Sequence, residues 1–159
     1  MPTLRADISD VYVFRRGGRV PEFLQLRRTR APLVGTWQPI MGHAREGETA
    51  RATALRELKE ETGLSPGSPG FLGMWSLDQV HPFYIAALDC ICLSPRFAVE
   101  AAPAWIPILN EEHDAARWTP ADDAASFVWP GQRAAVAEVL EILRGGVAER
   151  LLRVPLDNG

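Results

Sequence analysis

The chain contains no block of basic residues, and no apolar run approaches the roughly 18 residues of a membrane-spanning helix. Its formal net charge is −3 over 159 residues, so it lacks the concentrated Lys/Arg surface that binds a nucleic-acid backbone. The first residues after Met1 do not form the apolar segment of a secretory signal peptide. We therefore expect neither a nucleic-acid polymer nor a membrane as partner, and a cytoplasmic location.

Cysteine is also scarce, with Cys90 and Cys92 standing two positions apart in an apolar stretch. On a strand, both side chains would point to the same face, which is poor geometry for a disulfide between them. Two buried, small hydrophobic side chains in a reducing compartment are therefore favoured over a metal or redox pair. No repeat, low-complexity tract or linker divides the sequence, which indicates a single domain over residues 1–159.

Strands and two helices are predicted along the chain. The predicted strands cover residues 11–14, 22–26, 37–41, 71–77 and 83–93, the first two of them forming a hairpin. The predicted helices cover residues 49–62, with Thr49 as N-cap and Gly63 after the last turn, and residues 132–144. Residues 94–110 are interrupted by prolines and give no assignment. Strands interspersed with helices predict an α/β fold in which helices cover a sheet.

The first predicted helix carries an acidic ridge, which we expect to face solvent. Glu57 and Glu61 lie one helical turn apart on one face, Glu60 lies beside them, and Glu48 stands near the start of the helix. A solvated charged face is the ordinary interpretation of such a helix, and charge alone slightly favours it. The alternative is a cation site, because hard divalent cations prefer clustered oxygen ligands.

The spacing decides between these interpretations. Five residues separate Gly42 from Glu48, seven more lead to Arg56-Glu57-Leu58, and Glu60-Glu61 and Gly63-Leu64 follow after one residue each. This pattern reproduces the complete signature of the Nudix hydrolase family. With each fixed residue near one in twenty by composition, a chance match is on the order of one in 10⁸. The chain therefore resembles a Nudix protein along essentially its whole length.

The resemblance implies an α/β/α sandwich with a mixed sheet, in which residues 42–64 form a loop–helix–loop. It implies that Arg56 orients the acids and that Glu48 braces the loop against the helix. The implied metal ligands are the side chains of Glu57, Glu60 and Glu61 and the backbone carbonyl of Met41. The implied cofactor is Mg²⁺, with Mn²⁺ as a substitute, and the implied reaction hydrolyses a nucleoside diphosphate linked to another group. Positioning and charge neutralisation dominate such phosphoryl chemistry, and divalent cations supply both.

Outside the signature, the chain resembles the dihydroneopterin triphosphate and dATP diphosphatase subgroup. The resemblance rests on Trp37 ahead of the signature and on the pair Glu112-His113 followed by Trp118. In that subgroup the glutamate of the pair is a further metal ligand or the general base, which here falls on Glu112, with Glu111 as the fallback. Residues 78–110 lack the polar, aromatic substrate loop of the subgroup, which argues against a pterin substrate.

Four residues are candidates for binding substrate. Trp37 is as suited to stacking on a base as to packing. His43 lies just inside the signature loop. Arg27 and Arg28 are candidates for a phosphate clamp, although the end of a solvated strand is their more ordinary interpretation. In contrast, Trp118 and Trp129 are expected to pack in the core, and His81 is expected to have no role in the site.

We therefore predict hydrolysis of a nucleoside triphosphate, or a similar triphosphate, to the monophosphate and pyrophosphate. One alternative is a nucleotide-sugar or dinucleoside polyphosphate hydrolase, and another is a sensor that binds a nucleotide without turnover. The predicted partner is a small phosphorylated molecule. Homodimers are common in the family that the chain resembles, and the apolar stretch 101–109 is a candidate for the interface or for a lid.

Overall fold

The computed structural model describes residues 1–156 of the chain. In chain order these residues form β1 (Thr3–Arg5), β2 (Ile8–Arg15), β3 (Glu22–Arg28), β4 (Trp37–Gln38), β5 (Ile40–His43), α1 (Ala50–Thr62), β6 (Phe71–Ser76), β7 (His81–Ile85), the 3₁₀ turn η1 (Ala86–Leu88), β8 (Cys90–Ser94), β9 (Arg96–Ala101), β10 (His113–Pro120), the 3₁₀ turn η2 (Ala124–Ser126), α2 (Pro130–Leu143) and α3 (Val147–Leu152). Within residues 1–156, no helix has both the length and the apolar character needed to cross a membrane.

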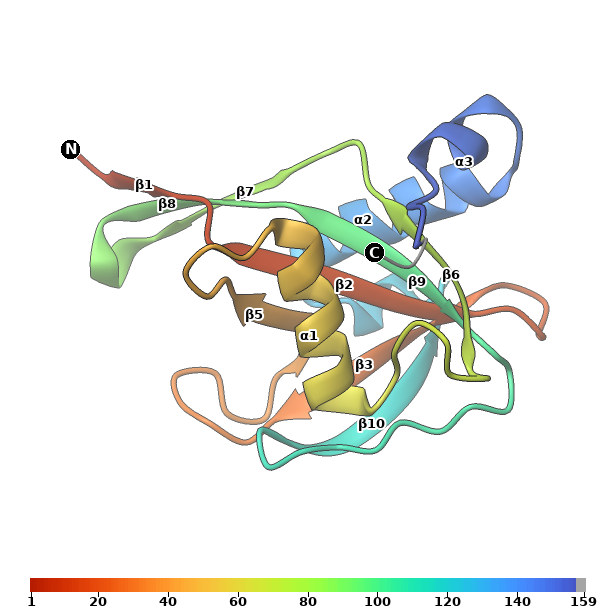
Figure 1. The fold of residues 1–159 in the computed structure, drawn as a ribbon. Coiled ribbons are helices and arrows are strands. Elements are labelled where there is room, and N and C mark those ends of the chain that lie inside the picture. Colours follow the sequence, from red (N-terminus) through yellow and green to blue (C-terminus); the bar gives the residue numbers. More distant parts are fainter. Residues whose placement is uncertain (157–159) are drawn as a thin grey trace.

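The larger sheet is mixed. Its strand order is β10-β3-β2-β9-β6, with β4 added to β3 and β5 added to β2. The β2–β9 pair is parallel, and the other pairs are antiparallel. A smaller sheet has the order β1-β8-β7. Helix α1 lies in front of the larger sheet and α2 lies behind it (Figure 1), so the predicted α/β/α sandwich with a mixed sheet is confirmed.

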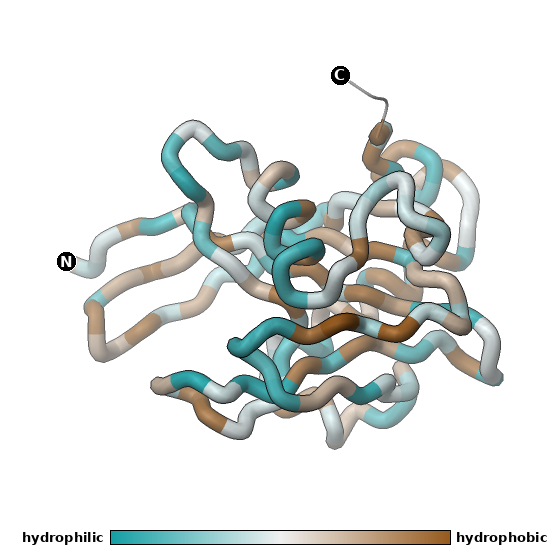
Figure 2. The backbone as a smooth tube through the Cα atoms, turned by 60° about the horizontal axis from the view of Figure 1, so that its bottom comes forward, coloured by the Kyte–Doolittle hydropathy of each residue, from teal (hydrophilic) through white to brown (hydrophobic). Residues whose placement is uncertain are grey.

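Strand β2 is buried on both faces, and its residues alternate between two hydrophobic cores. Val11 and Val13 belong to the core beneath α1, which also contains the fully buried Leu58 of that helix. Tyr12 and Phe14 belong to the core beneath α2. This alternation follows from the two-residue period of a strand. In Figure 2, most turns of α1 have hydrophilic colours.

The sheet divides between β2 and β3. These strands pair only next to their hairpin turn, at Phe14–Phe23 and Arg15–Glu22. Farther along, β2 pairs with β5 and β3 pairs with β4. The single strand predicted over residues 37–41 is therefore two short strands with different partners. Pro39 lies between them, and its lack of an N–H group favours the break.

One other predicted strand needs correction, and one strand lies where none was predicted. The strand predicted over residues 83–93 is a hairpin, in which β7 turns through η1 and Asp89 (φ 43°) into β8. Strand β9, which lies in the unassigned segment 94–110, is buried along its whole length between β2 and β6. The predicted arrangement of Cys90 and Cys92 is confirmed, because both are buried and unbonded, with their Sγ atoms 3.8 Å apart.

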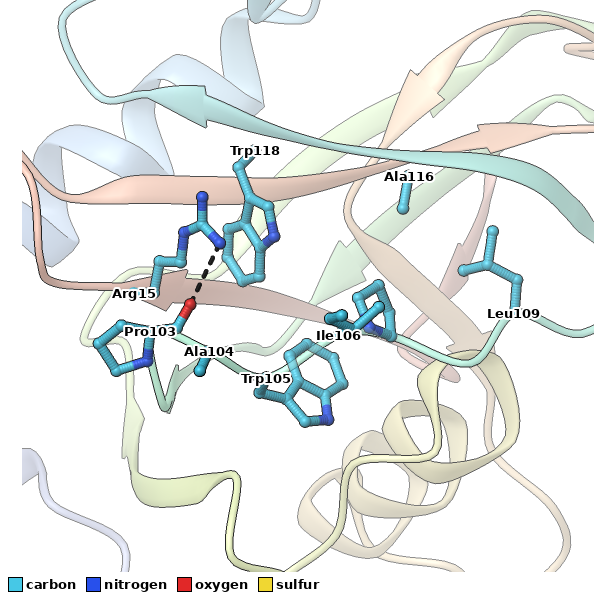
Figure 3. A pocket seen from close by; sticks show the side chains of 9 residues that line it. Arg15, Pro103, Ala104, Trp105, Ile106, Leu109, Ala116 and Trp118 are labelled. Carbon is cyan, nitrogen blue, oxygen red and sulfur yellow. Dashed lines mark hydrogen bonds between the residues drawn. The ribbon is translucent and has the colours of Figure 1, made fainter.

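The loop between β9 and β10 is anchored at two places. The Trp105 ring packs edge-on against Trp118, with their centroids 6.3 Å apart, and Arg15 lies 4.3 Å from the centroid of Trp118. These side chains line a shallow, largely apolar pocket of about 350 Å³ (Figure 3). Near α1, Ile108 donates its backbone N–H to the carbonyl of the last helical residue at 2.9 Å. Ile106 and Ile108 are exposed, and an interface at this loop stays a prediction.

The two tryptophans expected in the core differ from each other. Trp118 is partly buried and packs against the core beneath α1, as expected. Trp129 is 40% exposed, so its placement in the core was wrong. It is the residue that precedes the first residue of α2, Pro130, and a side chain at such a helix terminus projects past the edge of the packed face.

Candidate functional site

The caps of α1 fix where its acids lie. The Thr49 side chain accepts a hydrogen bond from the N–H of Ala52 at the start of the helix. At the end, Gly63 adopts a left-handed conformation (φ 77°), and its N–H donates to the carbonyl of Lys59 at 2.9 Å. The predicted N-cap and terminal glycine are thus confirmed. The acidic residues occupy the second half of the helix, next to β5 and the start of β10.

Arg56 connects the signature loop with the helix. Its guanidinium donates to both oxygens of Glu48, at 2.8 and 3.0 Å, and to the carbonyl of His43 at 2.8 Å. It also donates to Glu57 at 2.5 Å and to Glu60 at 3.2 Å. The Arg56 side chain is only 15% exposed, so its charge is poorly screened by water. One cation therefore holds three of the acids at once.

Glu48 is held permanently in its charged form. Hydrogen bonds from Arg56 and from the backbone N–H of Arg45 lower the pKa of Glu48 to about 2. The Thr53 hydroxyl donates to the same carboxylate at 3.0 Å. Because its oxygens are occupied by these donors, Glu48 is a brace between the loop and the helix.

Gly42 leaves the space that Glu57 occupies. A Cβ atom added to Gly42 would lie 2.0 Å from the carboxyl carbon of Glu57 and 2.2 Å from its Oε1. No side chain fits there, so glycine is required by close approach. Burial raises the pKa of Glu57, and the neighbouring Arg56 opposes this rise.

Glu61 is buried, which corrects the expectation of a ridge that faces solvent. Glu61 is only 2% exposed, and its Oε2 has no hydrogen-bond partner among the described residues. Burial, followed by the negative charges of Glu57 and Glu112, raises the pKa of Glu61 to about 9. Glu61 stands three residues after Leu58 and seven after Ala54, so it shares the buried face of the helix, which packs against β2 and β5. Nδ1 of His113 lies 3.8 Å from Oε2 of Glu61.

Glu112 lies close enough to the acidic helix for its charge to raise the pKa of both Glu57 and Glu61. Its side chain is 42% exposed and pairs with Arg30 at 3.3 Å. Its neighbour Glu111 is 83% exposed and pairs with the same arginine at 2.8 Å. Glu112 is therefore the acid of this pair that is oriented toward the helix.

The two arginines predicted to form a phosphate clamp already have partners. Arg27 pairs with Asp114 at 2.7 Å, and both side chains are about half exposed. Arg28 donates to the carbonyls of Arg30 and Ala31, at 2.8 and 3.2 Å. A phosphate would have to replace these partners, which exposed ion pairs allow at little cost.

Trp37 and His43 lie on different strands bordering the division of the sheet. The guanidinium carbons of Arg117 and Arg27 lie 4.2 and 5.7 Å from the centroid of the Trp37 ring, so part of its surface already makes cation–π contacts. His43 is 62% exposed, and its Nδ1 lies 3.2 Å from a carboxylate oxygen of Asp7. Both residues are therefore at least partly accessible to solvent.

Comparison with known proteins then identifies the family. The model of the NUDIX domain matches residues 4–139, most of the chain. The chain belongs to the Nudix family. It is a Nudix hydrolase.

Solved Nudix structures share its fold. A C. elegans Ap4A hydrolase in a binary complex is 20% identical with a TM-score of 0.71, covering 89% of this chain and 99% of that one. The E. coli dihydroneopterin triphosphate pyrophosphohydrolase is 22% identical with a TM-score of 0.69, covering 86% and 99%. A stretch of 108 residues is 35% identical to an octanoyltransferase of Myxococcus xanthus, covering 64% of this chain but only 28% of that protein.

Nudix hydrolases use divalent metal, and the residues of this Nudix hydrolase fit such an ion. Within residues 1–156, no three His, Cys, Asp or Glu side chains are gathered closely enough to hold a metal, although Glu57 and Glu60 both accept hydrogen bonds from Nη1 of Arg56. The donors are nevertheless hard oxygen ligands. The unpaired Oε2 of Glu61 lacks a counter-charge, and Gly42 keeps the space around the Glu57 carboxylate open.

Proposed function

We propose that this enzyme hydrolyses a nucleoside triphosphate, or a similar triphosphate, to the monophosphate and pyrophosphate with the help of Mg²⁺. One observation carries the proposal: a buried acid, Glu61, has an unpaired carboxylate oxygen beside two further acids, Glu57 and Glu112. A fold does not retain such a cluster for its own stability, because burial and mutual repulsion both oppose ionisation. A bound divalent cation removes both penalties.

The proposed metal ligands are the carboxylates of Glu57, Glu60 and Glu61 and the backbone carbonyl of Met41, and Glu112 is proposed either as a further metal ligand or as the base. Arg56 is proposed to orient these acids, because it contacts both the signature loop and the helix. A bound divalent cation would neutralise charge on the phosphate oxygens and make a water molecule more acidic. Mn²⁺ has the same preference for oxygen ligands and would replace Mg²⁺.

The chain's own contribution to hydrolysis is positioning and proton transfer. Water supplies a hydroxyl group to one phosphorus, and its proton must be removed as the bond to the leaving pyrophosphate breaks. Glu112 is proposed as the base that receives this proton, because its exposed side chain is accessible to water and lies near the other acids. Glu111 points more fully into solvent and is the less suitable base.

The remaining site residues are proposed to hold the substrate. Trp37 would stack on the nucleobase of the substrate. Arg27 and Arg28 would exchange their present partners for phosphate oxygens. His43 would line the path to the signature loop. A small phosphorylated molecule is the proposed partner, whereas the single domain over residues 1–159, the cytoplasmic location and the homodimer stay predictions from the sequence.

The experiment is a panel of nucleoside triphosphates with Mg²⁺, in which inorganic pyrophosphatase converts released pyrophosphate into phosphate for colorimetric detection. We expect pyrophosphate from at least one triphosphate. Glu61→Gln should lower turnover at least about a hundredfold, as expected when a charge that stabilises the reacting phosphate is lost. The control, Glu46→Gln, removes an exposed carboxylate from the signature loop and should retain wild-type turnover.

Adding dinucleoside polyphosphates and nucleotide sugars to this panel separates the alternatives. Cleavage of dinucleoside polyphosphates or nucleotide sugars, with no pyrophosphate from any triphosphate, would assign the enzyme to the second substrate class. That class has some support from the fold shared with the Ap4A hydrolase. Nucleotide binding by calorimetry without any product would indicate a sensor. Full activity of the Glu61→Gln variant would refute the metal assignment itself.

A further inference from the structure

Two buried atoms without hydrogen-bond partners face each other across the site. Among the described residues, four buried side-chain atoms lack a partner, and two of them are Oε2 of Glu61 and Nδ1 of His113. These atoms lie 3.8 Å apart, and their side chains are 2% and 5% exposed. A charge-assisted hydrogen bond is about 2.7–2.9 Å long. An approach of roughly 1 Å would therefore satisfy both atoms at once.

An irregularity in β10 turns His113 toward α1. His113 pairs with Arg28, whereas Ala115 pairs with the residue before Arg28, so Asp114 is an extra residue in the ladder. In a regular strand, His113 would lie on the same face as Ala115, away from α1. Because of the bulge, the side chain of His113 lies instead on the same side of the sheet as that of its pairing partner Arg28. Leu26, in the core beneath α1, lies on that side as well. The backbone thus deviates from regular pairing at the residue that faces Glu61.

We propose that His113 is a positioning residue for the cation site, whose Nδ1–H donates to Oε2 of Glu61 and holds that carboxylate toward the bound cation. The inference rests on the proposed function, because it requires Glu61 to be a ligand. A carboxylate that loses its proton on binding a cation can only accept hydrogen bonds, and the Nδ1–H tautomer of a neutral imidazole supplies a donor. Removing such a partner of a metal ligand typically weakens metal affinity about 10–100-fold.

Two substitutions of matched shape test the donor separately from the volume of the ring. In His113→Asn, the side-chain nitrogen stands at the same number of bonds from Cβ as Nδ1, so the donor is kept. His113→Leu has the same branched shape as asparagine and no donor. The measurement is Mn²⁺ affinity without substrate, from the electron paramagnetic resonance of unbound Mn²⁺. We expect about 10–100-fold weaker binding for His113→Leu and near wild-type binding for His113→Asn.

A double-mutant cycle with Glu61→Gln tests whether His113 acts through Glu61. We expect His113→Leu to cause no further loss of Mn²⁺ affinity in that background. Wild-type Mn²⁺ affinity in His113→Leu, or equal losses in the Leu and Asn variants, would overturn the inference and leave the proposed function intact. Absence of Mn²⁺ binding by the wild type would overturn the proposed function as well.

Nuclear magnetic resonance gives a second measurement on the unmodified chain, which decides the question if His113→Leu does not fold. We expect Mg²⁺ to bring the Nδ1-bound proton of His113 into slow exchange with water, with a downfield shift typical of a hydrogen bond to a carboxylate. The same proton should show no such change in Glu61→Gln. An imidazole signal unaffected by saturating Mg²⁺ in the wild type would overturn the inference.

Discussion

The substitution Glu61→Gln should stabilise the metal-free protein. The pKa of Glu61 is raised from 4.5 to about 9 by burial and by neighbouring acids. Between these values the unfolded chain has lost the proton and the folded chain keeps it. The contribution of Glu61 to the free energy of unfolding is therefore undiminished below about pH 4.5. Between that pH and about pH 9 it falls by about 1.4 kcal/mol per pH unit. At pH 7 the accumulated cost is about 3 kcal/mol.

Glutamine has nearly the same shape and cannot ionise, so it removes this cost. The buried amide itself costs roughly 1 kcal/mol if its N–H groups find no partner. We therefore expect a net gain of about 2 kcal/mol in the free energy of unfolding at pH 7, more at pH 8 and less at pH 6. The measurement is urea unfolding in EDTA, followed by the fluorescence of the five tryptophans, at each of these pH values.

Adding Mg²⁺ should reverse the order of stability. A cation that binds only the folded state raises the free energy of unfolding. The increase grows with the logarithm of the ratio of the cation concentration to its dissociation constant. The wild type should gain more than Glu61→Gln, because the variant lacks one ligand charge. If the variant is no more stable than wild type in EDTA at pH 8, and the difference does not change with pH, then the burial argument for Glu61 is refuted.

Three further predictions concern the same site. Gly42→Ala should lower turnover at least about a hundredfold, because its Cβ would displace the carboxylate of Glu57, a proposed ligand, by about 1 Å or more, whereas Gly18→Ala, whose Cβ meets nothing closer than 3.7 Å, should keep wild-type turnover. Glu112→Gln should lower kcat by about 10²–10⁴-fold and Glu111→Gln should leave it unchanged; the opposite ranking in steady-state assays would move the base to Glu111. The pKa of Glu48 is about 2, so its stabilising contribution is present above pH 4.5 and is lost as pH falls through about 2. Acid unfolding followed by circular dichroism should therefore separate Glu48→Gln from wild type at pH 5, and the two curves should converge near pH 2; a gap that persists there would contradict this account.

The sequence predicted the parts of the site that depend on local chemistry. Thr49 and Gly63 define both ends of α1 through contacts within a few residues, so the helix was predicted almost to the residue. The fixed spacing from Gly42 to Glu61 likewise predicted the family, which the match to the NUDIX domain confirmed. The roles of the individual acids stay predictions, because neither the fold nor the family match measures what they bind.

The parts that depend on distant contacts could not be predicted. Strand β9 consists of Arg96-Phe97-Ala98-Val99-Glu100-Ala101, in which neither alternation nor a continuous apolar run is evident, and its burial follows only from pairing with β2 and β6. The burial of Glu61, in contrast, follows the helical period, because Glu61 stands seven residues after the buried Ala54 and three after the buried Leu58. The position of His113 depends on a bulge, and no composition pattern around Asp114 indicates one. Regular alternation would have placed His113 on the wrong face.

The hydrogen bonds of Arg56 would allow the site to hold Glu57 and Glu60 in the metal-free state and to release them to a bound cation. The Arg56 guanidinium has two hydrogen bonds to Glu48 and one to the carbonyl of His43, and these do not involve the proposed ligands. If Glu57 and Glu60 turned to a bound cation, Arg56 would therefore keep a full counter-charge and several acceptors. Such an exchange would leave no buried charge unpaired, and so would avoid the penalty of roughly 3–5 kcal/mol that breaking a buried ion pair usually carries. Glu61 has no such temporary partner, and for this reason the cost of the metal-free state falls mainly on that residue.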